Sequence, residues 1–271
     1  MLNLGTDEIV KYPFLAEAGK YLSDKGFSLE QFGTDPDLKR IVDMAVERIK
    51  ISTEGKIYSS DVSETNSSLP MEVFSFLIAV ILLKLTGMHT LIRRFSLAEA
   101  RRSERFLEKD LANYKDKTKE EMALKIMHDL FSITIQKKDD DFIIPISNYL
   151  KHSINFHERE WKLINRKIDN GSVFLTSHET VRLVRKEIDR YISTKIHSAN
   201  TPEMIEGFQE HVNSLKNLAK KFEVKTVESS EYPPCIKHAI EVLEKGENLP
   251  HSGRFMPVSY THLTLPTSDL V

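Results

Sequence analysis

The stretch from Val73 to Leu83 constrains the fold most, because its eleven residues are all apolar apart from one serine. Glu72 and Lys84 bound it on either side. A bilayer-spanning helix needs about 20 apolar residues, so this run is too short to cross a membrane. We therefore expect a helix that is buried on most of its faces and lies at the centre of a hydrophobic core, with no membrane partner. A chain of 271 residues is long enough to build such a core.

Most of the other segments predict helices. Asp35 is a suitable N-cap residue, and Pro36 suits the first position of a helix. The apolar residues that follow keep helical spacing, so a helix is predicted up to Lys50. Further helices are predicted over 8–25, with Pro13 as a kink, and over 90–113, 117–131, 147–169, 178–195, 202–222 and 236–245.

A short region breaks this helical pattern. Ser132–Gln136 and Phe142–Ile144 are β-rich runs on either side of a charged segment, which indicates a small hairpin. Val173–Leu175 is a third strand-like run. The expected fold class is mainly α, a helical domain with a small β-hairpin element.

Composition excludes several functional classes. Lys and Arg number 38 against 40 Asp and Glu, so a nucleic-acid role would need a local basic patch. The single cysteine, Cys235, excludes an intrachain disulfide framework and a thiolate metal cage built from this chain alone. The first residues lack the apolar core of a signal peptide, and we expect a cytoplasmic, reducing location.

No complete active site is visible in the sequence. The ten glycines are scattered and form no phosphate-cradling loop. Asp139 and Asp141 have the spacing of a metal-binding pair, but their Lys-Lys-Asp-Asp-Asp context favours an exposed acidic turn. His152 and His157 are five residues apart, a poor spacing for one helix face, and we expect them to be solvated. A non-catalytic role is favoured.

Three basic sets could contact phosphate or an acidic partner. Between Arg93 and Lys109, six basic residues alternate with three acidic ones. That mixture suits either a solvated face with pairs such as Arg101–Glu104 or a protein contact, because acidic neighbours repel phosphate. The second set surrounds three aromatic residues that could stack on bases, although Trp161 is favoured as a core residue. The second set is Lys151, Arg159, Lys162, Arg166 and Lys167, with the aromatic residues Tyr149, Phe156 and Trp161. The third set is Arg182, Arg185, Lys186 and Arg190.

Several segments, taken in order, carry a resemblance to a known family. They are Tyr12-Pro13-Phe14-Leu15 with Glu17-Ala18, Arg93–Ala100, Asn148–Lys151, Trp161–Leu163 with Asn165-Arg166, Gly171–Leu175, Pro233–Lys237 and Gly246–Phe255. The last two are the most specific. Together they make the chain, up to about Met256, similar to the large, regulatory subunit of the archaeal–eukaryotic DNA primase in its archaeal form.

The resemblance implies a non-catalytic subunit. Residues 1–222 would be a helical domain that docks the small catalytic subunit in a heterodimer, 223–231 a linker, and 232–257 the start of a domain with a [4Fe-4S] cluster. That domain would help to grip the single-stranded DNA template and the RNA primer. Cys235 matches the first cluster ligand, and His251 and Arg254 match positions that face nucleic-acid phosphates.

The chain departs from the family pattern after Pro257. The three other cluster cysteines are absent, so we expect a truncated iron–sulfur domain and no assembled cluster here, although the intact protein would hold one. Residues 258–271 resemble adaptor-derived sequence and are expected to be non-native. Two other functions stay open: a stand-alone helical adaptor that binds no nucleic acid, and a nucleotidyltransferase that uses Asp139 and Asp141.

Overall fold

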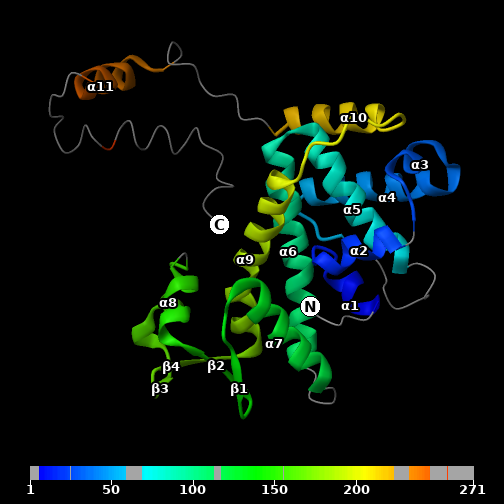
Figure 1. Ribbon diagram of the computed structural model, residues 1–271. Coiled ribbons are helices and arrows are strands. Elements are labelled where there is room, and N and C mark those ends of the chain that lie inside the picture. The colour runs from blue at the N-terminus through cyan, green and yellow to red at the C-terminus, as the bar shows by residue number, and fades with distance from the viewer. Residues whose placement is uncertain are drawn as a thin grey trace. The chain divides into compact units, whose positions relative to one another are not determined.

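A computed structural model describes residues 6–24, 26–58, 69–112, 117–154, 156–222, 232–244 and 255 (Figure 1). The chain divides into two compact units, Met1–Ala219 and Lys220–Val271. The predicted linker 223–231 and the tail 258–271 lie outside the described residues, so the predicted domain boundaries stay a prediction.

The first unit is mainly helical with one small sheet, as the sequence predicted. Its helices precede and follow the sheet region, which also contains the 3-10 turns η1 (Arg159–Trp161) and η2 (Leu163–Asn165). The helices are α1 (Thr6–Lys11), α2 (Ala16–Asp24), α3 (Leu29–Thr34), α4 (Pro36–Thr53), α5 (Leu69–Thr86), α6 (His89–Leu111), α7 (Lys117–Phe131), α8 (Ile146–Ser153), α9 (Ser177–Ser198) and α10 (Gln209–Lys220). The second unit contains α11 (Pro234–Glu244).

Local capping chemistry sets several helix boundaries. The Asp35 side chain accepts a hydrogen bond from the Asp37 amide at 2.9 Å, and Pro36 occupies the first turn of α4 as predicted. At the start of α9, Thr176 and Glu179 form a reciprocal capping box. Pro13 lies between α1 and α2, so the first predicted helix is two helices.

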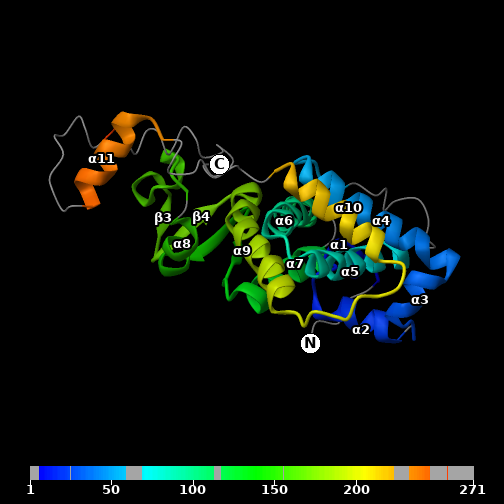
Figure 2. The same ribbon diagram turned by 90° about the horizontal axis from the view of Figure 1, so that it is seen from above.

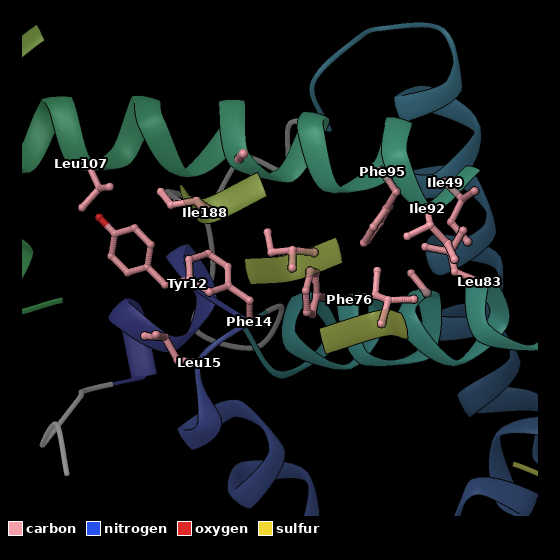
Figure 3. Packing of buried hydrophobic residues seen from close by; sticks show 14 of the residues in the cluster. Tyr12, Phe14, Leu15, Ile49, Phe76, Leu83, Ile92, Phe95, Leu107 and Ile188 are labelled. Carbon is pink, nitrogen blue, oxygen red and sulfur yellow. The ribbon is translucent and has the colours of Figure 1, made fainter. Parts of the chain in front are cut away.

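Helix α5 lies in the middle of the hydrophobic core, which confirms the interpretation of the apolar run. Val73, Ile78, Leu82 and Leu83 are completely buried. Figure 3 shows Leu83 and Phe76 of α5 among side chains from the segment between α1 and α2 and from α4, α6 and α9. No described helix meets the length and hydropathy needed to cross a membrane.

The longest helices, α6 and α9, lie side by side in both Figure 1 and Figure 2. The Ser96 hydroxyl donates to Asp189 at 2.5 Å across this contact. Burial raises the pKa of the Asp189 carboxyl, although this hydrogen bond and nearby cationic side chains oppose the rise.

The sheet has four antiparallel strands in the order β1-β2-β4-β3. The strands are β1 (Gln136–Lys138), β2 (Asp141–Pro145), β3 (Ile168–Asp169) and β4 (Ser172–Leu175). The predicted first strand, 132–136, was wrong: β1 starts only at Gln136. The residues before it include Ile133 and Ile135, whose buried side chains anchor the chain to the core after α7 instead of pairing in the sheet.

Two predicted helices are shorter than their sequence patterns indicated. The helix predicted over 147–169 ends at Ser153, and the chain continues through the two 3-10 turns into β3. The helix predicted over 202–222 begins at Gln209. The segment before it is fixed by tertiary contacts, because Ile205 and Phe208 are buried and Gly207 crosses the end of α3 at Gly33.

We predict that this glycine crossing tolerates no side chain. A Cβ added at Gly33 would lie 1.9 Å from the Glu206 carbonyl oxygen, so Gly33→Ala should lower the unfolding free energy by about 1–3 kcal/mol. Gly19 in α2 is the control, because a Cβ there meets nothing within 4 Å. Gly19→Ala should raise stability by about 0.5–1 kcal/mol through helix propensity. Urea denaturation measures both, and equal effects would contradict the crossing.

Candidate functional site

The site residues predicted in the second unit are only partly described. Cys235 is the second residue of α11 and is exposed, while Ile236 and Ala239 of the same helix are buried. His251 and Arg254 lie outside the described residues. Their expected contact with nucleic-acid phosphates therefore stays a prediction.

The residues of this chain do not fit a complete iron–sulfur cluster. Such a cluster is held by four protein ligands, usually cysteines, and the sequence contains one cysteine. Within the described ranges, no group of three or more His, Cys, Asp or Glu residues could hold a metal ion.

A buried network of charges occupies the centre of the first unit. Arg48 of α4 donates from Nε to Glu99 Oε1 at 2.6 Å and from Nη2 to Glu99 Oε2 at 2.7 Å, a bidentate pair. Its Nη1 also donates to the Ser75 hydroxyl at 3.1 Å. Both charged side chains are almost completely buried. The network therefore connects α4, α5 and α6.

The pKa shifts in this network follow from burial and pairing. Burial alone would lower the pKa of Arg48, but the Glu99 and Glu72 carboxylates outweigh it and raise that pKa. Burial alone would raise the pKa of Glu99, but Arg48 outweighs it and lowers that pKa. Both groups stay charged at neutral pH.

A second buried arginine, Arg102, lies on α6. Its guanidinium donates to the carbonyl oxygens of Val10 and Lys11 at 3.2 and 3.3 Å, which attaches the end of α1 to α6. Burial, together with the nearby Arg48 charge, lowers the pKa of Arg102 to about 10. One alternative from the sequence was that the basic residues of α6 form a solvated face. The burial of Arg102 shows that this is wrong for part of the set.

The acidic residues of α6 are also engaged. Glu104 pairs with Arg185 at 3.2 Å, and Glu108 Oε1 lies 3.0 Å from His178 Nδ1. In the part of the chain that the structure describes, these contacts run to α9 and not along α6, so the predicted pairs within the helix were wrong. The sequence could not indicate this, because only the packing of α9 brings its side chains within reach.

The aromatic residues of the second basic set form a closed stack. Phe156 stacks on Trp161 with ring centroids 4.2 Å apart, and the Arg166 guanidinium lies 4.8 Å from the Trp161 ring. Tyr149 and Trp161 are both buried, which confirms Trp161 as a core residue. Because protein covers the rings of Tyr149 and Trp161, these two rings are not available to stack on the bases of a nucleic acid.

Polar bonds fix the same stack to α9. The Tyr149 hydroxyl donates to the Trp161 carbonyl at 2.7 Å and accepts from Arg166 Nε at 3.0 Å. Arg166 also donates to Glu179 at 2.5 Å. This last hydrogen bond lowers the pKa of Glu179 even though burial acts to raise it. The region between β2 and β4 is thus held firmly against the helical body.

The two histidines differ from the prediction that both are solvated. His157 is exposed, but His152 is buried, with Nδ1 3.2 Å from Glu187 Oε1 of α9. His152 lies on α8, whose inner face packs against α9, so it follows Tyr149 into the interior. Its burial was not evident from the histidine spacing alone.

The acidic run at 139–141 is the exposed turn that the sequence favoured. Asp139 has a left-handed backbone, with φ of 58°, in the turn between β1 and β2. Lys167 lies 3.9 Å from Asp141, and Lys138 pairs with Asp169 at 3.0 Å. The turn is therefore surrounded by lysines.

Four large apolar side chains are exposed in the same chain segment that carries the aromatic stack. Leu150 and Ile154 are 49% and 74% exposed, and their spacing places them on one face of the α8 segment. Ile164 in η2 is 90% exposed, and Ile168 in β3 is 43% exposed. These four residues, which we call the apolar surface, all come from 150–168. The sequence alone did not identify these residues.

Comparison with known proteins gives a consistent result. A curated "DNA primase large subunit PriL" from Methanocella arvoryzae is 29% identical over 92% of this chain and 67% of its own length. The protein of the same name from Methanosarcina acetivorans is 29% identical over 94% of this chain and 68% of its own length. A third, from Halobacterium salinarum, is 26% identical over 96% of this chain and 74% of its own length. No family model matches the chain.

The buried pair predicts a specific acid sensitivity. The folded-state pKa of Glu99 lies below its ordinary value of 4.5, so its stabilisation is present above pH 4.5 and is lost as the pH falls through the folded value. Glu99→Gln should lower the unfolding free energy at pH 7 by about 3 kcal/mol or more. It should also flatten the loss between neutral and acidic pH, as measured by urea denaturation.

Glu54 provides the matched control for this prediction. It pairs with Lys56 at 2.8 Å, but both side chains are largely exposed. Glu54→Gln should leave the unfolding free energy and its pH dependence nearly unchanged. Identical pH profiles for the wild type and Glu99→Gln would contradict the proposed role of Glu99.

Proposed function

We propose that the chain belongs to the family of archaeal DNA primase large subunits and that it supports primer synthesis by binding the small catalytic subunit without catalysing the reaction itself. The observation that carries this proposal is the similarity to proteins named as primase large subunits over more than nine-tenths of the chain. The expected setting is cytoplasmic DNA replication.

We assign docking of the small subunit to the apolar surface. Four of the seven large apolar side chains that are exposed among the described residues come from this one segment. Burying an exposed isoleucine contributes roughly 1.5–3 kcal/mol, so a partner that covers several of them gains enough for stable association. The polar anchors of Tyr149 and Arg166 hold the segment in place, which reduces the entropy that binding would cost.

Binding of this kind would promote primer synthesis through proximity. A subunit that contacts both the catalytic subunit and the template converts a second encounter into an intramolecular one. In this arrangement the metal-binding carboxylates belong to the small subunit, and Asp139 and Asp141 of this chain need not take part. Their exposed turn, with lysines on both sides, agrees with that division of labour.

The second unit would supply template and primer contacts. We propose that residues 232–257 are the start of the iron–sulfur domain, with Cys235 as its first ligand. His251 and Arg254 are charged or polar donors three residues apart, which is suitable for phosphate. The exposure of Cys235 on α11 leaves its thiol accessible to further ligands.

The alternative is a stand-alone helical adaptor that binds no nucleic acid. The comparisons do not favour it, since the similar proteins carry the name of a primase subunit. Co-purification separates the two. The chain should form a stoichiometric complex with the primase small subunit of its own source, and failure to do so would contradict the proposed function.

The apolar surface predicts which substitutions break that complex. The double variant Ile154→Asp/Ile164→Asp should weaken binding of the small subunit by about 100-fold or more, because two charges replace buried apolar contacts. Isothermal titration calorimetry of the two purified subunits measures the change. Both side chains are exposed, so thermal unfolding should be unaffected.

Met204 is the matched control for docking. It is a large apolar side chain, 46% exposed, outside the 150–168 segment. Met204→Asp should bind the small subunit as the wild type does. Equal losses in both variants, or none in the double variant, would place the docking surface elsewhere.

The single thiol makes a prediction about iron. After anaerobic reconstitution with iron and sulfide, the 271-residue chain should hold no stoichiometric cluster, because one cysteine cannot replace four ligands. Iron analysis and visible absorbance measure this, with Cys235→Ser as the reference. A stable cluster in the wild type that is absent from Cys235→Ser would show that other residues complete the ligand set.

A further inference from the structure

Helix α6 carries mixed charges in the sequence, but its fold separates them. Of its acidic residues between Arg93 and Lys109, Glu99 is buried against Arg48, and Glu104 and Glu108 contact α9. Arg102 is buried against backbone carbonyls of the N-terminal segment. The acidic side chains therefore have partners inside the unit, and their negative charge is largely compensated or turned toward α9.

Three further cations of this helix follow one another at intervals of four residues. Arg105 and Lys109 are exposed and Arg101 is half-buried. None of the described residues pairs with any of the three by a hydrogen bond or ion pair. We call Arg101, Arg105 and Lys109 the basic ridge.

The geometry of the ridge points to an extended anion. Residues four apart lie on one face of a helix, and each step of four advances by about 6 Å. The three cations thus form a line along α6 and not a cluster around one point. A line of evenly spaced cations matches the phosphates of a nucleic-acid strand better than it matches a single small anion.

We propose that the basic ridge of Arg101, Arg105 and Lys109 binds the phosphate backbone of single-stranded nucleic acid without reading its sequence. The choice of a nucleic acid over an acidic protein segment rests on the proposed function, because a primase subunit works beside a single-stranded template. The ridge would be a contact of the helical unit itself, separate from those proposed for His251 and Arg254.

The ridge and the apolar surface belong to different elements. The cations lie on α6, and the apolar side chains lie on α8, η2 and β3. A substitution in one should therefore leave the other intact. This separation allows the nucleic-acid contact and the docking of the small subunit to be tested independently.

The test measures binding of a fluorescent oligo(dT) by anisotropy at several salt concentrations, with the 271-residue chain. Each phosphate contact contributes about 0.7 to the slope of log K against log salt for a single strand. The triple variant Arg101→Gln/Arg105→Gln/Lys109→Gln should weaken binding and reduce that slope by about 2. Arg101→Lys/Arg105→Lys should keep the wild-type slope, since phosphate contact needs charge and not the guanidinium plane.

The matched control is Lys39→Gln/Arg40→Gln/Lys50→Gln on α4. These three residues are exposed and their replacement changes the net charge by the same amount. The control should keep the wild-type slope, and circular dichroism should show both triple variants folded. Equal slopes in the two triple variants, or an unchanged ridge variant, would overturn the proposal.

Two further outcomes keep this proposal distinct from the proposed function. If poly-glutamate displaces the oligonucleotide from the ridge as effectively as unlabelled oligo(dT), the ridge binds acidic peptide and the proposal is overturned. The ridge variant should still co-purify with the small subunit. Loss of that complex would mean that the ridge is a protein interface, whereas a wild-type chain that binds oligo(dT) but no small subunit would overturn only the proposed function.

Discussion

The Arg48–Glu99 ion pair is the constraint on which the helical unit depends. Helix α5 is apolar on nearly all sides, so hydrophobic burial alone gives it little preference for one rotation about its axis. Arg48 removes that freedom by donating to Ser75 and to the Glu72 carbonyl while it pairs with Glu99. Two buried charges are tolerated only when they are paired, so α4, α5 and α6 must meet in one arrangement.

Buried polar groups must also be paired where the N-terminal segment meets α6. Arg102 satisfies carbonyl groups at the end of α1, and Lys11 and Tyr12 contact Asp110 at the other end of α6. Burial and the nearby Asp110 raise the pKa of the Tyr12 hydroxyl well above its ordinary value, so it stays a hydrogen-bond donor at neutral pH. Helix α6 thus makes polar contacts that position several of its neighbours, while its Arg105 and Lys109 are exposed.

The segment between strands β2 and β4 is attached to the helices by its own polar contacts. Tyr149, Trp161 and Arg166 fasten the segment between β2 and β4 to α9, with Glu179 as the link that also caps that helix. A firmly held segment can leave isoleucines exposed without losing its own order. This explains how a surface suited to a partner can exist beside a well-packed core.

Periodicity and capping determined much of the fold from the sequence alone. The spacing of apolar residues located α4 to α7 and α9, and the motif segments carried the family resemblance, because these signals depend on residues that are close in the chain. The same reasoning gave Trp161 as core and Asp139 as part of an exposed turn. Cys235 was singled out as a ligand by its motif, and the structure adds only that it is exposed.

Tertiary structure alone decided how the polar side chains are used. The sequence placed Arg, Glu and His residues on α6, α8 and α9, but whether each faces solvent or a partner depends on which helices pack together. Glu99 became a buried counter-ion, His152 became buried against Glu187, and Arg105 stayed exposed. The physical reason is that hydrophobic spacing is a local property of the chain, whereas the pairing of charges requires residues that are far apart in sequence to meet.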